Sequence, residues 1–284
     1  DLQGFDAVAH LAELSNDPLG QQNPELTFQI NHQGSVRLAN EARKAGVKRF
    51  VYMSSCSVYG VGKDDGVLDE TSEVNPQTAY AECKVRVEND LTPMNDANFT
   101  TCFMRNATAY GASPRQRFDI VLNDLCGLAW TTKEIKLLSD GKPWRPLVHA
   151  LDMCQAIYCA LNADQDKIAG QRMNVGSTDQ NYRVIDIAKI VADEFPDCTL
   201  SVGEPSADNR SYRVNFDKIQ KLMPDFKCEW TAEKGAAQLH KVFKAINMTP
   251  EIFQANPYTR LKMLMKYKAD GLLTDDLYWS SSDL

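Results

Sequence analysis

Short apolar runs that alternate with helix-patterned segments constrain the fold of this 284-residue chain more than any other feature. Residues 6–12 (DAVAHLA), 49–55 (RFVYMSS) and 99–111 (FTTCFMRNATAYG) have the length and residue types of buried strands. Residues 24–45 and 79–91 lie between them and carry apolar side chains at helical spacing. Such alternation is typical of a parallel sheet covered by helices. The sequence therefore predicts an α/β fold built on a doubly wound parallel sheet.

The chain after Gly111 has a less regular pattern. We expect helices over 118–132, 151–163 and 182–195, two strands joined by a glycine turn within 134–150, a strand at MNVGS, and a mainly helical end from Thr231. The second half is thus predicted to be a smaller mixed α/β unit.

Composition excludes several classes of function. The net charge of -7 and the lack of a basic run argue against nucleic-acid binding. No apolar run reaches the roughly 20 residues that span a bilayer, and the first residues lack the features of a signal peptide. The eight cysteines form no C-x-x-C pair, and the four histidines share no ligand-like spacing. We expect a cytoplasmic protein with reduced cysteines, no metal and no membrane partner.

A tyrosine four residues before a lysine is one candidate catalytic pair. The spacing occurs three times, at Tyr59 and Lys63, at Tyr80 and Lys84, and at Tyr258 and Lys262. Tyr80 follows a strand that ends in two serines, Ser54 and Ser55, and ligands bind at the carboxyl ends of strands in open α/β sheets. Tyr59 lies in the glycine-rich YGVGK, where a helix is not expected, and no serine-bearing strand end is near Tyr258 in the sequence. On the expected helix, Tyr80 and Lys84 share a face, and a neighbouring ammonium lowers the pKa of a phenol. Tyr80 is therefore the candidate general acid and base.

A glycine-rich phosphate-binding loop is not found between the first strand and the first helix. The nearest sequence is YGVGKDDG, whose glycines miss the G-x-G-x-x-G spacing and whose two aspartates would repel phosphate. We interpret it as a solvated loop. Any phosphate-binding half of a dinucleotide site is expected upstream of residue 1.

Five motifs in order give the chain a family resemblance: HLAELSNDP with a following Asn31, VKRFVYMSSCSVYG, TAYAECK, FMRNATAYG and WRPLVHALDMCQAI. Together they resemble the extended short-chain dehydrogenase/reductase family, in particular its NAD-dependent nucleotide-sugar epimerase/dehydratase group. The resemblance covers nearly the whole chain from Asp6. It implies a Rossmann-type sheet, NAD as the cofactor with NADP left open, a nucleotide-diphosphate sugar as the substrate, and a homodimer.

The same resemblance implies roles for individual residues. It makes Ser55, Tyr80 and Lys84 catalytic, with Tyr80 as acid and base and Lys84 on the nicotinamide ribose. The implied cofactor contacts are Ala12, Asn31, Ser54, Tyr80, Lys84 and Thr108, and the implied substrate contacts are Asn123, Arg145 and Arg210. It also implies a division into a partial NAD(P)-binding domain, 1–111 with 150–177 returning to it, and a substrate domain, 112–149 and 178–284.

Departures from the family pattern narrow the expected reaction. Dehydratases of the group place Asp and Glu directly after the catalytic Ser or Thr, whereas this chain has Cys56 and Ser57. Glu13 replaces a small residue, and Thr108 stands where the family has Asn. By comparison with the family layout, about 60 residues are missing at the start, so we expect a fragment of a longer protein.

These observations predict an NAD-dependent nucleotide-sugar epimerase of the 4-epimerase type. Two alternatives stay open: an NAD(P)H-dependent ketosugar reductase of the same family, and a non-catalytic binding protein that kept the fold.

Overall fold

A four-stranded parallel sheet forms the centre of the protein, and the computed structural model describes residues 2–61, 66–204 and 211–280. The strand order is β1-β2-β4-β8. The bounds are Ala7–His10 for β1, Arg49–Ser55 for β2, Thr100–Asn106 for β4 and Arg172–Val175 for β8. All three pairings are parallel, so the strands end at one edge of the sheet, as the alternating sequence pattern predicts.

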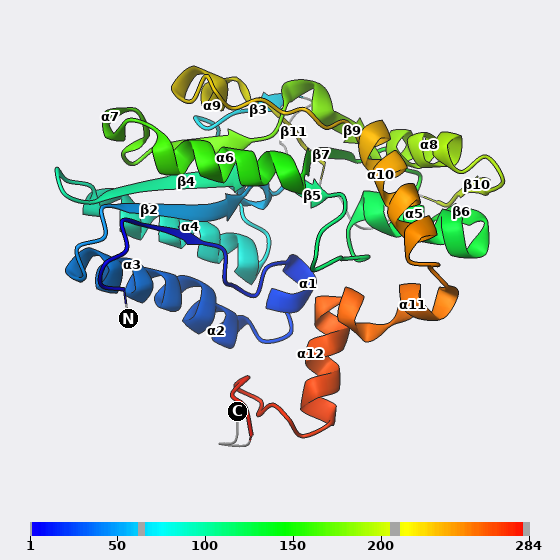
Figure 1. Cartoon of the computed structure of the whole chain (residues 1–284), viewed down its shortest axis with the longest axis horizontal. Coiled ribbons are helices and arrows are strands. Elements are labelled where there is room, and N and C mark those ends of the chain that lie inside the picture. Colours follow the sequence, from blue (N-terminus) through cyan, green and yellow to red (C-terminus); the bar gives the residue numbers. More distant parts are fainter. Residues whose placement is uncertain (1, 62–65, 205–210, 281–284) are drawn as a thin grey trace.

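Helices cover both faces of this sheet (Figure 1). One face carries a continuous helical segment made of α2 (Pro24–Thr27), the π-helix η1 (Phe28–Gln33) and α3 (Gly34–Lys44), followed in space by α4 (Ala79–Leu91). The opposite face carries α6 (Ala150–Asn162) and α7 (Gln165–Ile168). A two-layer cover of this kind buries a parallel sheet on both sides.

Alternate side chains of β2 explain the two cores. Phe50 and Tyr52 pack with α3 and α4, whereas Val51 and Met53 pack on the other side with Ala156 of α6. The period of two that a strand imposes thus fills both layers from one short sequence.

The second half builds smaller sheets beside the first. β5 (Thr108–Tyr110), β7 (Trp144–His149) and β9 (Asn181–Arg183) form one; β6 (Glu134–Leu137) pairs with β10 (Thr199–Val202), and β3 (Val67–Leu68) with β11 (Arg213–Val214). The helices here are α5 (Val121–Thr132), α8 (Val184–Glu194), α9 (Asp217–Leu222) and α10 (Ala232–Ala245). Helices α5, α8 and α10 share an apolar core with β6 and β7.

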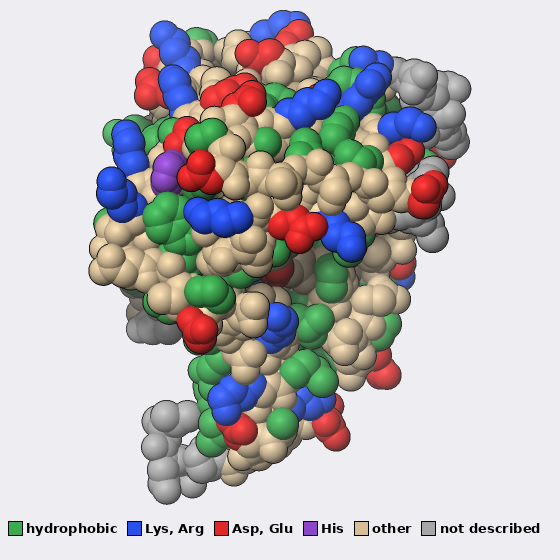
Figure 2. All heavy atoms as spheres, turned by 90° about the vertical axis from the view of Figure 1, so that its right-hand side faces the viewer, with side chains coloured by type: hydrophobic (Ala, Val, Ile, Leu, Met, Phe, Trp, Pro, Cys, Tyr) green, Lys and Arg blue, Asp and Glu red, His purple; other side chains and the backbone are tan. Residues whose placement is uncertain are grey.

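The C-terminal helices return toward the start of the chain. After α11 (Pro250–Gln254) and the short 3-10 helix η5 (Asn256–Tyr258), helix α12 (Arg260–Ala269) contacts α1 (Asp17–Gly20). The segment projects below the body of the protein in Figures 1 and 2. Figure 2 also shows acidic and basic side chains interspersed on that face. Helix α12 therefore brings residues distant in sequence to the edge of the sheet where β1 ends.

Three further 3-10 turns complete the chain: η2 (Cys56–Tyr59), η3 (Thr92–Met94) and η4 (Thr178–Gln180). Within the ranges given above, no helix is both long and apolar enough to cross a bilayer.

Candidate active site

A cavity of about 800 Å³ opens where β2 and β4 end, between the sheet and the second half of the chain. Its walls include Ser55, Tyr80 and Lys84, together with Thr108, Asn123 and Arg145 from the second half. Ser54 lines it as well, so seven of the residues expected from the sequence to bind or react with ligands are brought to one pocket. The parallel strands explain its position, because their carboxyl ends leave a crevice at one edge of the sheet.

Ser55 is placed by the end of its strand. It is the last residue of β2, its backbone is extended, and its hydroxyl oxygen accepts the N–H of Ser57 at 3.1 Å. Because the oxygen is held in this way, the hydroxyl hydrogen is left to donate. The Ser55 side chain is hydrogen-bonded to Tyr80, a bond that favours the phenolate.

Tyr80 lies in the first turn of α4. Thr78 caps this helix, its side chain accepting the N–H of Ala81 at 3.2 Å and donating to Asp17 of α1 at 2.5 Å. Gly20 lets α1 approach closely, since a Cβ there would lie 3.2 Å from the Tyr80 Cβ. Capping and close packing therefore fix the phenol at the pocket wall.

Lys84 follows one turn later, as the spacing predicts. Its side chain is buried, its ammonium donates to the Met53 carbonyl, and it lies 5.4 Å from the centre of the Tyr80 ring. The carboxylate of Glu13, equally buried, is 2.6 Å from the Lys84 Nζ. The pair expected to act together is in place, but a carboxylate that the sequence analysis did not assign to the site stands beside it.

The expectation that Lys84 lowers the pKa of Tyr80 below its ordinary value is wrong as a net statement. Burial raises that pKa, the Lys84 charge and the bond to Ser55 lower it, and the Glu13 charge raises it again. Desolvation of the phenol has a larger effect on its pKa than the charge of Lys84, and the ion pair of Lys84 with Glu13 partly offsets that charge. The phenol therefore keeps its proton in this state.

Unsatisfied polar atoms gather around the cavity. Among the described residues, five buried side-chain atoms lack a hydrogen-bond partner, and three of them belong to residues that line the pocket: Ser57 Oγ, Asn106 Oδ1 and Tyr110 Oη. A fourth, Glu13 Oε2, faces Lys84. Buried polar atoms normally find partners, so this concentration fits a site for a polar ligand. The sequence marked Ser57 and Glu13 as departures from the family pattern, but it assigned none of these atoms to a ligand.

Arginines give the pocket an excess of positive charge. Arg115, Arg117 and Arg145 line it, and Arg260 reaches it from the first position of α12. Arg260 donates to Ser15 in the loop after β1, and its pKa is lowered by burial and then by the charge of Arg117. Only Arg145 was expected, because nothing local in the sequence relates Arg260 to a loop that precedes it by 245 residues.

Several expected ligand contacts are engaged with the protein itself. Asn31 is fully buried and exchanges two hydrogen bonds with the backbone of Leu14, at 2.9 and 3.0 Å. Asn123 lines the pocket, but its side chain bonds to both backbone groups of Gly111. Ser54 donates to Glu88 at 2.6 Å. In this structure these residues hold the loops of the site.

The other predicted residues differ in their relation to the cavity. Ala12 is exposed and does not line it, whereas Thr108 does. Arg145 lines it and donates to the Trp144 carbonyl at 2.9 Å. Arg210 lies outside the described residues.

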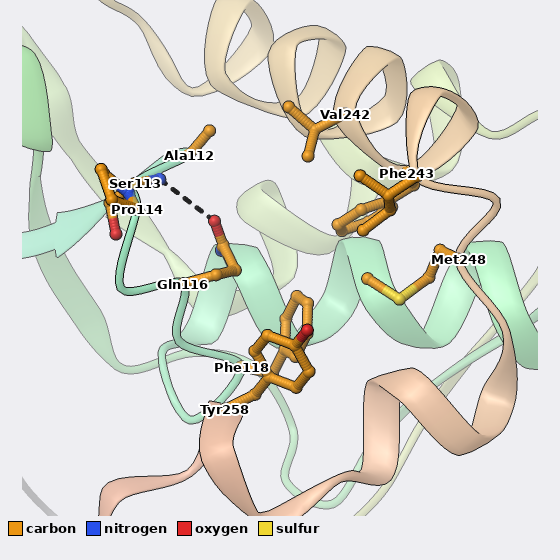
Figure 3. A pocket seen from close by; sticks show the side chains of 10 residues that line it. Ala112, Ser113, Pro114, Gln116, Phe118, Val242, Phe243, Met248 and Tyr258 are labelled. Atoms are coloured by element: carbon orange, nitrogen blue, oxygen red, sulfur yellow. Dashed lines mark hydrogen bonds between the residues drawn. The ribbon is translucent and has the colours of Figure 1, made fainter.

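The other two tyrosine-lysine pairs are elsewhere. Tyr59 is buried, with its hydroxyl on Asn174 at 2.8 Å, and Lys63 lies outside the described residues. Tyr258 lines a different, largely apolar cavity of about 460 Å³. Figure 3 shows it beside Phe118, and their ring centres are 5.2 Å apart. Neither tyrosine is among the residues that line the cavity of Ser55 and Tyr80.

The two residues after Ser55 have different environments. Cys56 is buried, donates to the Arg105 carbonyl at 3.1 Å, and burial raises the pKa of its thiol. Ser57 lines the pocket.

Two carboxylates line the pocket among the described residues, those of Asp17 and Asp119, and they bond to Thr78 and Arg117 respectively. The described part of the chain contains no group of His, Cys, Asp and Glu suited to a metal ion.

The sequence is similar to those of known enzymes. The sequence model of the NAD dependent epimerase/dehydratase family matches residues 1–176. A dTDP-D-glucose 4,6-dehydratase of Mus musculus is 27% identical over 191 residues, which cover 66% of this chain and 52% of that protein. A UDP-glucose 4-epimerase of Streptococcus mutans is 24% identical over 251 residues, covering 77% of this chain and 74% of that protein. The chain thus spans about half the length of the mouse relative.

Solved structures share the fold. A UDP-glucose 4-epimerase of Thermotoga maritima, with UDP-glucose, has a TM-score of 0.75 at 21% identity, covering 86% of this chain and 78% of that one. MoeE5 in complex with UDP-glucuronic acid and NAD has a TM-score of 0.74 at 24% identity, covering 86% and 81%. At these identities the likeness establishes the α/β architecture.

Proposed function

Because the chain belongs to the NAD dependent epimerase/dehydratase family, we propose that it acts in an NAD-dependent nucleotide-sugar epimerase of the 4-epimerase type. The observation that carries the proposal is the meeting of Ser55, Tyr80 and Lys84 in one polar cavity at the strand ends. A serine, a tyrosine and a lysine in this arrangement can move a proton to and from a sugar hydroxyl.

The cavity suits the nicotinamide end of the cofactor. Lys84 has three N–H donors, of which one reaches Met53, and the unpaired Asn106 Oδ1 offers an acceptor in the same wall. Lys84 would hold ribose hydroxyls, and Asn106 would accept from an amide or a hydroxyl group. NAD, when bound, supplies the acceptor and donor for the hydride on C4 of the sugar.

Tyr80 carries the proton of the proposed reaction. After the phenol has lost its own proton to solvent, its oxygen takes the proton of the 4-hydroxyl as C4 is oxidised, keeps it while the keto sugar turns over, and returns it when C4 is reduced from the opposite side. Ser55, with its oxygen fixed by Ser57, donates to the oxygen that bears developing charge. The raised pKa of Tyr80 makes its phenolate a stronger base toward the 4-hydroxyl, although a smaller fraction of Tyr80 is ionised near neutral pH.

Epimerisation is favoured over loss of water by the residues that follow Ser55. Removal of a sugar hydroxyl as water needs an acid and a base near that hydroxyl. Cys56 is buried with a raised thiol pKa and points at a carbonyl, and Ser57 has no titratable group. The two pocket carboxylates are already bound to other side chains.

The arginines support an anionic substrate. Arg115, Arg117, Arg145 and Arg260 line one cavity, and guanidinium groups bind phosphate oxygens in a fork geometry. A nucleotide-diphosphate sugar supplies that charge. The homodimer and the cytoplasmic location expected from the sequence stay predictions.

The test uses the intact protein with pairs of nucleotide sugars that differ at C4, followed by NMR without added cofactor. We expect interconversion of one pair, and Tyr80→Phe should lower kcat at least about 100-fold while the fold is retained. Net consumption of added NADPH would instead indicate the reductase. Absence of NAD binding by the folded protein would defeat the enzymatic proposal.

A further inference from the structure

Glu13 is a buried carboxylate beneath the candidate active site. It follows β1 at a position where the resembled family has a small residue, and only 2% of its side chain is exposed. Its Oε1 accepts from Tyr52 of β2 at 2.6 Å and from Ser35 of α3 at 3.3 Å, and its Oε2 lies 2.6 Å from the Nζ of Lys84 on α4. Three elements therefore converge on one acid.

The contact with Lys84 is held by charge. Although the two atoms are 2.6 Å apart, Oε2 receives no aligned hydrogen bond from the described residues. The Lys84 ammonium also donates to Met53 and lies 4.7 Å from the Tyr52 ring centre, closer than the 5.4 Å to the Tyr80 ring centre. Glu13 thus draws the ammonium toward the floor of the pocket.

Charged groups from several elements act on Tyr80. Lys84 on the same helix and Arg260 on α12 favour the phenolate, whereas Glu13 after β1 and Asp17 on α1 favour the phenol. Ser55 at the end of β2 donates to the phenol oxygen, and Tyr52 and His10 lie in the same cluster around Glu13 and Lys84. Of the charges that oppose Lys84 at Tyr80, Glu13 has the larger effect.

We propose that Glu13 is a positioning residue: it anchors Lys84 and opposes the Lys84 charge at Tyr80, so that Tyr80 keeps its proton until substrate and cofactor are in place. The consequence for catalysis rests on the proposed function. A phenolate whose proton affinity is raised in this way is a stronger base toward the 4-hydroxyl, and the phenol that it then forms returns that proton to the keto oxygen.

The experiment titrates Tyr80 directly, without catalysis. The alkaline rise of tyrosinate absorbance is measured in the intact protein, and the same curve for Tyr80→Phe is subtracted within each background. Removal of the opposing charge in Glu13→Gln should shift the Tyr80 titration down by about one pH unit. Glu13→Ala, which restores a small residue, should shift it in the same direction, and Glu13→Asp should return it toward the wild-type pH.

Glu88→Gln is the matched control. Glu88 is also a buried carboxylate paired with a cation, Arg105 at 2.6 Å, but it is not among the main influences on Tyr80. It should leave the Tyr80 titration unchanged, whatever its effect on stability. If Glu13→Gln and Glu13→Ala also titrate at the wild-type pH, or higher, the role of Glu13 is refuted.

A pH profile of kcat separates this inference from the proposed function. If the wild type interconverts C4 epimers, the acidic limb should move to lower pH in Glu13→Gln by the same amount as the titration. If the wild type has no such activity but the titration shifts, the proposed function fails and the electrostatic role of Glu13 stands.

Discussion

Two buried carboxylates, Glu88 on helix α4 and Glu13 after β1, differ in how their oxygens are hydrogen-bonded. Glu88 receives Ser54 and Arg105 on one oxygen and Arg105 and Arg172 on the other, at 2.6 to 2.9 Å. Glu13 receives hydroxyls on one oxygen, while its other oxygen meets Lys84 without an aligned hydrogen bond. An ion pair whose hydrogen bonds are all satisfied mainly stabilises the fold. A carboxylate with an unsatisfied oxygen beside a cavity can instead change the pKa of a reacting group there.

The cations also differ. Arg105 is buried in the core and cannot lose its charge, so it depends on Glu88. Lys84 is also buried, but unlike Arg105 it lines the cavity. The same chemical change at the two acids should therefore have different consequences.

The largest effect on stability is expected at Glu88. Glu88→Gln leaves the Arg105 guanidinium buried with only a neutral partner, which should lower the free energy of unfolding by about 3–5 kcal/mol. Urea denaturation at pH 7 measures it. A loss no greater than that of Glu13→Gln would contradict the distinction between the two carboxylates.

A smaller loss is expected at Glu13. In Glu13→Gln the Lys84 ammonium keeps its bond to Met53 and can turn toward the cavity, so the loss should be about 2–3 kcal/mol. The same denaturation series gives this value. If Glu13→Gln and Glu88→Gln lost the same free energy of unfolding and the Tyr80 titration did not change, both carboxylates would have only a structural role.

Asp124 is a third carboxylate, half-buried and without a side-chain hydrogen bond or ion pair among the described contacts. Burial, followed by the charge of Asp119, raises its pKa to about 6. The folded state therefore binds a proton more tightly than the unfolded state, and this contribution to stability is lost as pH rises from about 4 to 6. The free energy of unfolding of Asp124→Asn, relative to that of wild type, should rise by roughly 1–2 kcal/mol between pH 4 and pH 7. If the difference in the free energy of unfolding between Asp124→Asn and wild type were constant over that range, the raised pKa of Asp124 would be refuted.

The smallest effect is expected at Tyr258. Tyr258→Phe removes a hydroxyl from the largely apolar cavity of Figure 3, which Ser55 does not line, and should change stability by less than about 0.5 kcal/mol. Its kcat should stay within about twofold of wild type, in contrast to Tyr80→Phe. A large loss of activity in Tyr258→Phe would show that the spacing had been assigned to the wrong tyrosine.

The sequence predicts much of the first half of the fold. Strand Arg49–Ser55 and helix Ala79–Leu91 have the expected bounds, because a dense apolar run marks the strand and Thr78 caps the helix. The helix expected over 24–45 is continuous, but it contains the π-helical turn Phe28–Gln33, which an apolar period of 3.6 does not reveal. The α/β class and the family inferred from five motifs are confirmed by the family match, and the cofactor of that family is NAD.

The site is less predictable than the fold. Ser55, Tyr80 and Lys84 follow from strand ends and helix spacing, which are local signals. The burial that raises the Tyr80 pKa and the ion pair of Glu13 with Lys84 arise from three-dimensional packing. Arg260 reaches the pocket only because α12 folds back against α1, so no sequence neighbour could have indicated it.

The fate of deuterium placed on C4 of the nucleotide sugar that the intact protein accepts distinguishes the proposed epimerisation from its alternatives. The proposed reaction returns the same hydride to C4, so the C4 epimer should form with its deuterium retained, without added cofactor and without loss of a hydroxyl group. Tyr80→Phe should form this product at least about 100-fold more slowly. Deuterium found on another carbon together with loss of water, or product formed only when NADPH is consumed, would contradict the account.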